Sequence, residues 1–569
     1  MHDPYARFHD LNDPETRRFA AEAHAETLAQ FAGSAEFSAL RDDIFAQLQD
    51  ERQIPFCQEH RARMYHFHQS EEFPKGVYRV CSAASYRAGM PDWEILFSVA
   101  DFDEILGDDV YLDGVSHYVE QPLQALLTLS AAGGDAAYTV EFDLANRRIV
   151  EGGFHFPAGK NHIAWRDADS VWVCPAWDER QLTASGYPRE VWLLRRGQEF
   201  SDGLPVFRME EDGVMVQAWR YLDGLGSPVD LIEAAAGFFT KTYYQVGADG
   251  TPRPLALPKD AEIAGYLTGQ LLVQLKTAWA RANQSYPAGS LVAVKLNKGM
   301  LGEAHLLFAP NAAQAVEAVE TTKRFVVASL LDNVSGSLKA WKWERDTWVE
   351  HPLPALPQGA IELADQPWGG DVLYLAASDF VTPLTLYALD LNVNELSVLR
   401  RQPAQFDAQG IETEQHFAQS ADGTPIPYYR VGRSGRQPET PAKRHPQSRS
   451  QLIKGKTMNK ALTGSLIGIV LIGGGLAGGS YYMGSRLEDS YRNSFNLNDK
   501  RFAVKLNNFS MGPLSGKAAW TGEITPDLCD SSLKFIVRGE DILHRSLAGY
   551  RVESKIYLVR PKDNSEVLL

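Results

Sequence analysis

Residues 191–219 read VWLLRRGQEFSDGLPVFRMEEDGVMVQAW, and the pattern of this stretch decides the fold. Its two ends, residues 191–194 and 214–219, are short runs rich in Val, Leu and Trp, and Gly, Asp and Pro punctuate the residues between them. We find about twenty such runs from about Met64 to Arg400, with no helical period between them. So many short strands are typical of a sandwich, a barrel or a propeller.

The length of this β-rich region favours the propeller. Roughly 335 residues are too many for one sandwich, whereas seven four-stranded blades of about 45 residues would use nearly all of them. No repeated blade signature is present, so the prediction depends on length and strand number. The expected fold class is mainly β, with a seven-bladed β-propeller over residues 61–405.

Residues 1–60 are predicted to form an N-terminal helical segment. Asp13-Pro14-Glu15-Thr16 offers an N-cap, a proline at the first helical position and an acidic first turn, and residues 19–31 are strong helix formers. A second helix is expected over residues 37–51. Its apolar residues have the spacing of one buried stripe: Leu40, Ile44, Phe45 and Leu48.

The net charge is −16 at pH 7 and is unevenly distributed along the chain. Residues 433–460 contain eight Lys or Arg and one Glu, and residues 461–569 contain thirteen Lys or Arg and eleven Asp or Glu, so the first 432 residues carry −25. A domain this acidic repels a phosphate backbone, which argues against nucleic acid as a partner. A solvated acidic face explains the charge, and attraction of cationic peptides is the alternative.

The chain offers few candidates for metal or cofactor chemistry. His66 and His68 point to one face of a predicted strand, but no Cys or carboxylate lies at zinc-site spacing beside them, which favours a structural role. No P-loop, G-x-G-x-x-G or H-E-x-x-H motif occurs, so we expect no metal and no cofactor. Four cysteines without C-x-x-C spacing suit a reducing compartment and are expected to be buried thiols: Cys57, Cys81, Cys174 and Cys529.

Several segments resemble the prolyl oligopeptidase family. The opening Asp3-Pro4-Tyr5, with Asp10 and Pro14-Glu15-Thr16, is similar to the D-P-Y-x-W-L-E-D-x-x-x-P-E-T start of these enzymes, with Arg7 where the family usually has Trp. The resemblance implies a seven-bladed propeller packed over an α/β-hydrolase domain, with a narrow tunnel that admits short peptides and excludes folded proteins. Further similar segments extend it to about residue 434: residues 182–189, 237–240, 286–291, 378–383, 406–411 and 414–427.

The chemistry of this family uses a serine on a G-x-S-x-G elbow, followed in the chain by an aspartate and a histidine. Residues 406–435 resemble only the opening strands of the hydrolase domain, and the Pro-, Ser- and Arg-rich residues 436–457 have the composition of a basic linker. The nearest match to the elbow is Gly-Gly-Ser-Tyr-Tyr at residues 478–482, which lacks the final glycine, so Ser480 is not expected to be a nucleophile. The sequence therefore predicts no catalytic residue and identifies no substrate-binding residue.

Residues 461–484 contain no charged side chain and predict a transmembrane helix. Basic residues before it, including Lys454, Lys456 and Lys460, place the propeller in the cytoplasm and the C-terminus in the periplasm by the positive-inside rule. Residues 458–569 also resemble the start of the YdgA-like bacterial inner-membrane proteins, in a glycine-rich anchor and the exit YYMGSRLE at residues 481–488. On this interpretation residues 485–569 are a small β-rich fragment of that family.

Together these patterns predict a gene fusion. The expected function is that of a prolyl oligopeptidase-like gating propeller, inactive alone and tethered to the inner membrane, which binds or gates short peptides. One alternative is a component of a serine-type oligopeptidase that a separate hydrolase domain completes, with activity toward peptides that contain proline. The other alternative is a propeller scaffold for protein partners.

Overall fold

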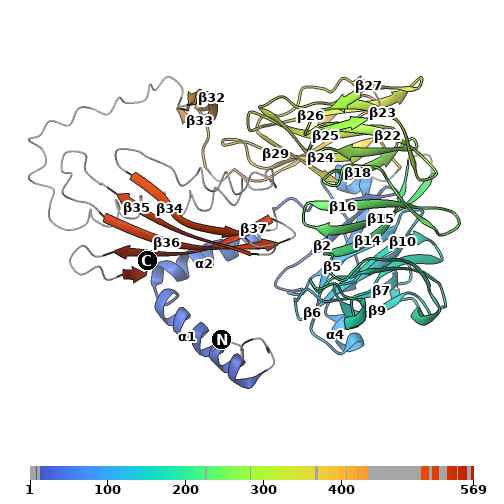
Figure 1. Cartoon of the computed structure of the whole chain (residues 1–569), viewed down its shortest axis with the longest axis horizontal. Coiled ribbons are helices and arrows are strands. Elements are labelled where there is room, and N and C mark those ends of the chain that lie inside the picture. The colour runs from blue at the N-terminus through green and yellow to red at the C-terminus, as the bar shows by residue number, and fades with distance from the viewer. Residues whose placement is uncertain are drawn as a thin grey trace, which may run out of the picture. The chain divides into compact units, whose positions relative to one another are not determined.

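The computed structural model describes Phe8, Asp10 and residues 13–433 apart from 51, 224–226, 282–283, 366–368, 405 and 421, together with the backbone of five strands between residues 502 and 568. The chain divides into two compact units, which are residues 1–236 with 241–435 and residues 237–240 with 436–569. The first unit contains two helices, a β-propeller and a hairpin, and the second contains a five-stranded sheet (Figure 1).

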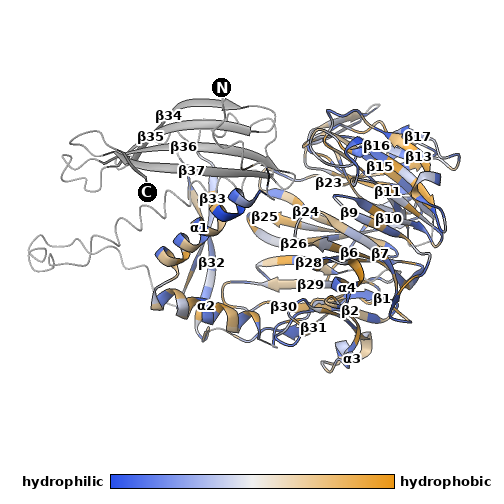
Figure 2. Cartoon of the chain, turned by 90° about the horizontal axis from the view of Figure 1, so that it is seen from below, coloured by the Kyte–Doolittle hydropathy of each residue, from blue (hydrophilic) through white to orange (hydrophobic). Residues whose placement is uncertain are grey.

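Two helices precede the propeller, as predicted. In α1 (Pro14–Phe31) the Asp13 carboxylate accepts a hydrogen bond from the Thr16 amide at 2.9 Å, and the Ser34 hydroxyl caps α2 (Ala35–Leu48) in the same way. The prediction of a buried stripe on α2 was wrong, because no residue of α2 is buried and nothing in the described part of the chain covers its apolar face. Apolar positions alternate with polar ones along both helices (Figure 2). The exposed apolar side chains are Phe19, Leu28, Phe31, Phe37, Leu40, Ile44, Phe45 and Leu48.

The predicted seven-bladed β-propeller is confirmed. Seven antiparallel sheets follow one another along the chain, and each takes its strands from one continuous stretch of sequence. The first blade contains β1 (Gln58–His60), β2 (Arg63–His68), β3 (Val77–Ser82) and β4 (Glu94–Ser98), with α3 (Ala83–Arg87) between β3 and β4. After α4 (Asp101–Leu106), the second blade contains β5 (Val110–Tyr118), β6 (Gln121–Ala131), β7 (Ala137–Asp143), β8 (Arg148–Ile149) and β9 (His155–Gly159).

The remaining blades repeat this plan. The third contains β10 (His162–Asp167), β11 (Ser170–Cys174), β12 (Glu190–Arg195) and β13 (Leu204–Arg208), and the fourth β14 (Met215–Leu222), β15 (Pro228–Gly237), β16 (Thr240–Val246) and β17 (Pro252–Pro254). The fifth contains β18 (Glu262–Leu267), β19 (Gln270–Gln274), β22 (Leu291–Asn297) and β23 (Met300–Phe308), with a separate hairpin of β20 (Trp279–Arg281) and β21 (Gln284–Tyr286). The sixth contains β24 (Gln314–Thr321), β25 (Phe325–Asp332), β26 (Ser335–Glu344) and β27 (Thr347–His351), and the seventh β28 (Ala360–Asp365), β29 (Val372–Ser378), β30 (Thr385–Asp390) and β31 (Glu395–Arg401).

Apolar side chains between neighbouring blades form the core. Strands read as near-continuous apolar runs because both faces of each sheet pack against another blade. Between the third and fourth blades, for example, the contact is made by side chains that are each at most 1% exposed: Trp172, Val191, Val216 and Ile232. The first strand of one blade contacts the first strand of the next, from β5 through β10, β14 and β18 to β24. The first strands therefore lie innermost around the propeller axis. Cys57, Cys81 and Cys174 are buried thiols, as predicted, and Cys529 lies outside the described residues.

A buried ion pair joins the second blade to the third. Glu141 on β7 is fully buried, and the two terminal nitrogens of Arg196 donate to its two oxygens at 2.8 and 2.9 Å. The Phe154 amide donates to the same carboxylate at 3.0 Å, and the Arg196 guanidinium lies 4.9 Å from the Phe154 ring centroid. This carboxylate is therefore satisfied by three hydrogen bonds that come from two blades.

The ring closes through side chains. Each blade takes its strands from one continuous stretch, so no exchanged strand holds the first blade to the seventh. Instead, the buried Glu59 carboxylate on β1 accepts hydrogen bonds from Arg87 at 2.6 Å and from the Tyr374 hydroxyl on β29. The Glu59 amide donates to the Asp365 carboxylate on β28 at 2.7 Å. We call these four residues the ring-closing cluster.

After the last blade, β32 (Ile411–Gln419) and β33 (Pro425–Arg433) form an isolated hairpin in full antiparallel register. It presents four exposed apolar side chains, which are Phe417, Ile426, Tyr428 and Val431. The second unit is an antiparallel sheet in the order β34 (Phe502–Met511), β35 (Ser515–Ile524), β36 (Phe535–Ser546), β37 (Gly549–Val559) and β38 (Glu566–Leu568).

The transmembrane helix in the predicted fold class is not supported. None of the helices in the described residues is long and apolar enough to cross a membrane. The longest of them, α1, carries charged side chains such as Glu15, Arg18 and Glu22 along its length, which exclude it from a bilayer core. The predicted span, residues 461–484, and Ser480 within it lie outside the described residues.

Candidate functional site

One end of the propeller axis is acidic. The first strands of the seven antiparallel blades run in one direction, so their C-terminal ends gather at the same end of the axis. Four carboxylates occupy or directly follow these ends, and we call this region the acidic mouth: Asp167, Asp223, Glu320 and Asp365. Burial raises the pKa of Glu320, and the neighbouring Asp365 carboxylate adds to the rise. The mouth therefore gathers carboxylates from four blades.

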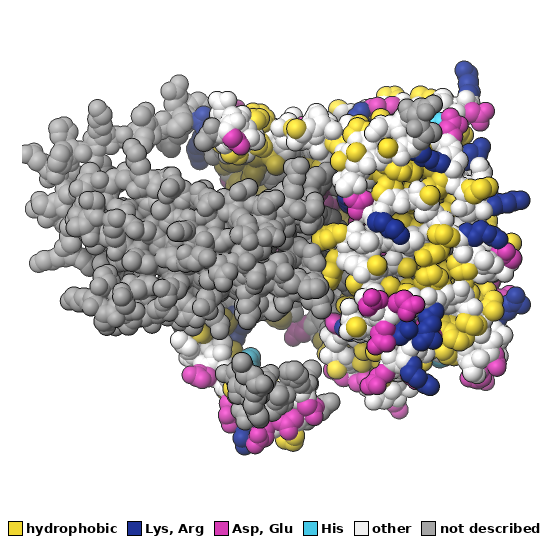
Figure 3. All heavy atoms as spheres, viewed as in Figure 1, with side chains coloured by type: hydrophobic (Ala, Val, Ile, Leu, Met, Phe, Trp, Pro, Cys, Tyr) yellow, Lys and Arg dark blue, Asp and Glu magenta, His cyan; other side chains and the backbone are white. Residues whose placement is uncertain are grey.

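Part of this charge is neutralised by two arginines. The Asp230 carboxylate on β15 accepts hydrogen bonds from Arg220 at 2.8 and 2.6 Å and from the Trp172 indole nitrogen at 3.1 Å. Arg166 lies 3.4 Å from the same carboxylate and 2.8 Å from Asp167. On the face of the propeller in Figure 3, acidic and basic side chains are likewise interspersed. The acidic mouth is thus a local feature, and the axial strands hold its charges in place.

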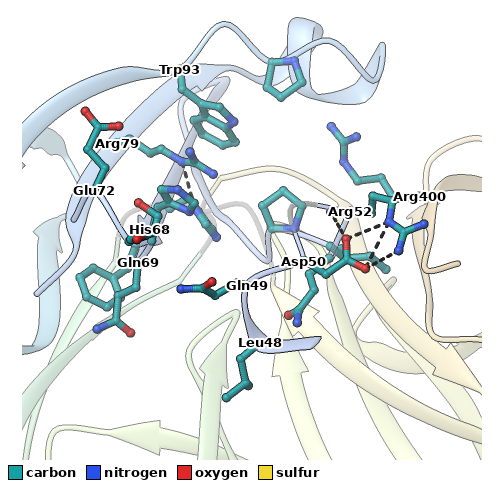
Figure 4. Close-up of a pocket in the computed structure, with 18 of the residues that line it drawn as sticks. Leu48, Gln49, Asp50, Arg52, His68, Gln69, Glu72, Arg79, Trp93 and Arg400 are labelled. Carbon is teal, nitrogen blue, oxygen red and sulfur yellow. Dashed lines mark hydrogen bonds and ion pairs between the residues drawn. The ribbon is translucent and has the colours of Figure 1, made fainter. Parts of the chain in front are cut away.

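The opposite end carries a groove between the first and seventh blades. The groove has a volume of about 1050 Å³ and is lined by the segment after α2, by β2, β3 and the residues before β4, and by the end of β31. It therefore lies where the chain enters and leaves the propeller. Trp93, Arg79 and His68 lie on one side of it, and Arg52, Asp50 and Arg400 lie on the other (Figure 4).

Both histidines that the sequence singled out line this groove. His66 and His68 lie on one face of β2, as predicted, with their ring centroids 6.1 Å apart. The Nε of Arg79 donates to Nδ1 of His66 at 3.2 Å, and the Trp93 ring centroid lies 5.6 Å from that of His66. No group of three or more His, Cys, Asp or Glu in the described part of the chain could hold a metal ion.

The groove arginines and the ring-closing cluster were not predicted as sites. Arg79 and Arg400 are 321 positions apart in the numbering, and only the closed ring brings them to one cavity. The weak signal available was the pair of adjacent arginines, Arg400 and Arg401, at the end of β31, which matches no known motif.

A family model for the prolyl oligopeptidase N-terminal β-propeller domain matches residues 1–402. The chain belongs to the prolyl oligopeptidase propeller family. An uncharacterized peptidase, y4nA, of Sinorhizobium fredii is 27% identical over 442 residues, covering 76% of this chain and 61% of the relative. A second uncharacterized peptidase, RP174 of Rickettsia prowazekii, is 25% identical over 439 residues, covering 74% of this chain and 61% of the relative.

Solved structures show the same fold. A post-proline cleaving enzyme from Rickettsia typhi superposes with a TM-score of 0.67 at 22% identity, over 76% of this chain and 65% of that one. Oligopeptidase B from Leishmania major gives a TM-score of 0.56 at 14% identity, over 76% and 61%. This chain, with its prolyl oligopeptidase propeller, spans about three-fifths of the length of the curated relatives that it matches. The resemblance of residues 458–569 to YdgA-like membrane proteins has no support among these matches.

Buried histidines of this prolyl oligopeptidase propeller should make its stability depend on pH. Burial lowers the pKa of His60 and of His66 to about 3 and that of His117 to about 4. His117 is held neutral, because Nδ1 donates to the Pro122 carbonyl at 2.7 Å and Nε2 accepts from the Tyr78 hydroxyl. In the unfolded chain these rings protonate near pH 6.5. Their contribution to stability is therefore complete above about pH 6.5 and is lost as the pH falls toward 4 and 3.

We accordingly expect the urea midpoint of the propeller to fall from pH 7 to pH 5. The variant His66→Gln should take up about one proton fewer on unfolding at pH 5.5, because it removes one ring that protonates only when unfolded. Proton uptake can be obtained from the pH dependence of the unfolding free energy. Equal uptake in the variant and the unaltered chain would contradict the assignment of His66 as a neutral folded-state histidine.

Proposed function

We propose that this propeller selects and gates short peptides for a serine-type oligopeptidase whose hydrolysis is performed by an α/β-hydrolase domain. The observation that carries the proposal is the match of residues 1–402 to the prolyl oligopeptidase propeller, folded as seven blades whose first strands lie innermost around one axis. The relatives are named peptidases, and a solved structure of the same fold is a post-proline cleaving enzyme. A ring of blades favours extended peptides, because a folded protein does not fit between the innermost strands.

The acidic mouth supports a preference among peptides. Carboxylates from several blades lie at one axial end, and Glu320 and Asp365 are close enough for one to affect the pKa of the other. Such a field raises the local concentration of cationic ligands and speeds their association. We therefore favour short peptides with Lys, Arg or a free amino terminus.

The hydrolase domain needs a surface on which to dock. The apolar side chains of α1 and α2 and those of the hairpin β32–β33 are exposed, and these elements lie directly before and after the propeller in the chain. Soluble proteins rarely leave so much apolar surface open unless a partner covers it. The occupant that we propose is the hydrolase domain, and we assign this domain to the part of the relatives that this chain does not match.

Activity measurements test this proposal. The purified 569-residue chain should not hydrolyse a chromogenic Gly-Pro dipeptide substrate, and a serine-directed fluorophosphonate should not label it, because its sequence has no G-x-S-x-G elbow. Adding the hydrolase part of the Sinorhizobium fredii relative as a separate chain should produce a complex and hydrolysis faster than that of either part alone. Labelling of any serine of this chain, Ser480 included, would contradict the proposal.

A matched pair of variants tests the docking surface. Phe45→Glu on α2 should weaken the complex and the hydrolysis, whereas Met300→Glu, on β23 and also well exposed, should leave both unchanged. If the hydrolase part does not bind and other proteins do, the propeller acts as a scaffold instead of a gate.

A further inference from the structure

Two arginines face the groove between the first and seventh blades without a carboxylate partner among the described residues. The guanidinium of Arg79 stacks 4.4 Å from the Trp93 ring centroid, and toward the described residues only its Nε donates, to His66. Arg400 lies 4.6 Å from the Tyr86 ring centroid and donates one terminal nitrogen to the Tyr86 carbonyl at 3.0 Å. The Nε of Arg400 is buried and has no hydrogen-bond partner in the described part of the chain.

These contacts leave the positive charges of Arg79 and Arg400, and several of their N–H donors, without a partner among the described residues. An arginine carries five N–H donors in a planar fork that matches a carboxylate or phosphate group. Both arginines are half-buried, where a guanidinium without a counter-charge costs free energy. Aromatic rings hold both side chains in place, which reduces the entropy lost when they bind a ligand.

The surrounding groups add to this pattern. A guanidinium can only donate, so Nδ1 of His66 must accept the hydrogen bond from Arg79. The neutral ring therefore carries its proton on Nε2 and can donate a further hydrogen bond. Asp50 on the opposite side is already paired with Arg52, at 2.7 Å. Glu71 and Glu72 also line the groove, yet neither of them nor any other described carboxylate pairs with Arg79 or Arg400.

We propose that the groove binds a small polyanion with two or more charged groups, whose carboxylate or phosphate groups are held by Arg79 on one wall and Arg400 on the other. A volume of about 1050 Å³ suits a molecule of that kind better than an ion with a single charged group, such as sulfate. Arg79 lies on the first blade and Arg400 on the seventh, so the ligand bridges the junction that closes the ring. This site lies at the opposite axial end from the acidic mouth and does not depend on the proposed peptidase function.

Isothermal titration calorimetry of the full 569-residue chain tests the site, with citrate and pyrophosphate as probes at constant ionic strength. One of the two should bind with a stoichiometry of one and raise the thermal midpoint, and the difference between them tells whether carboxylate or phosphate is preferred. Arg79→Met and Arg400→Met should each weaken binding by about tenfold to a hundredfold, the loss expected for a charge-assisted hydrogen bond. Arg79→Lys keeps the charge without the fork and should bind with intermediate affinity.

The control is Arg180→Met, at an exposed arginine that pairs with Asp178 outside the groove. It should bind the probe as the unaltered chain does. Circular dichroism establishes that each variant is folded before titration. The proposal would be overturned if neither probe bound to the unaltered chain. It would also be overturned if the folded Arg79→Met and Arg400→Met variants bound the probe as tightly as the unaltered chain does.

Discussion

Replacing Arg196 by methionine should lower the free energy of unfolding by about 3–5 kcal/mol, among the largest effects expected of any single change in this chain. Methionine keeps much of the apolar stem of Arg196 but removes the guanidinium that lies over the Phe154 ring and both of its hydrogen bonds to Glu141. The Glu141 carboxylate is fully buried, so water cannot replace the lost donors. An uncompensated buried charge of this kind is far more costly than the loss of an exposed ion pair. Urea denaturation followed by tryptophan fluorescence measures the change.

Two further variants separate this mechanism from a general effect of losing an arginine. Arg180→Met removes an exposed ion pair with Asp178 in the same blade and should cost less than about 1 kcal/mol. The double variant Glu141→Gln, Arg196→Met buries no charge and should be more stable than Arg196→Met alone. If the double variant is the less stable of the two, the buried carboxylate is not the cause.

Replacing Glu59 by alanine should cost about 3 kcal/mol and should loosen the junction between the first and seventh blades. The change leaves the Tyr374 hydroxyl without its acceptor and Arg87 without its counter-charge. Burial is the largest cause that raises the pKa of Tyr374, and the hydrogen bond to Glu59 is the second. The hydroxyl therefore stays protonated and needs this acceptor. Hydrogen exchange should show the loss of protection first in β1 and β28, the innermost strands on either side of the junction.

The matched control is Glu94→Ala, in the same blade, where the carboxylate forms an exposed pair with Arg147. That variant should lose less than about 1 kcal/mol and should keep the protection of β1 and β28. Loss of protection spread evenly over all seven blades in Glu59→Ala would show that the cluster has no special role in ring closure.

The strands were accessible from the sequence because each is a local apolar run. Residues 171–173 and 191–194 fall within β11 and β12, and residues 372–375 within β29. Several tight turns were less visible. The turn between β25 and β26 places Asn333 and Val334 at φ values of 47° and 62° without glycine, where a β-branched residue is unusual.

The sites were not accessible, because they depend on residues that only the closed ring brings together. Nothing near Glu59 in the sequence indicates Tyr374, and nothing near Arg79 indicates Arg400. The spacing of apolar residues in α2 correctly predicted a helix, but spacing alone does not say whether a partner is present to cover its stripe. The prediction of a membrane span at residues 461–484 likewise used only a local pattern, the absence of charged side chains. The described residues contain no helix that is long and apolar enough to cross a membrane.

Closure of the ring by side chains also sets the timing of folding during synthesis. The hydrogen bond between Glu59 and Tyr374 joins residues 315 positions apart. At a translation rate of about 5–20 residues per second, the first blade leaves the ribosome roughly 15–60 seconds before its last neighbour exists. During that interval one face of the first blade has no blade to pack against, and its apolar side chains are available to chaperones or to another nascent chain.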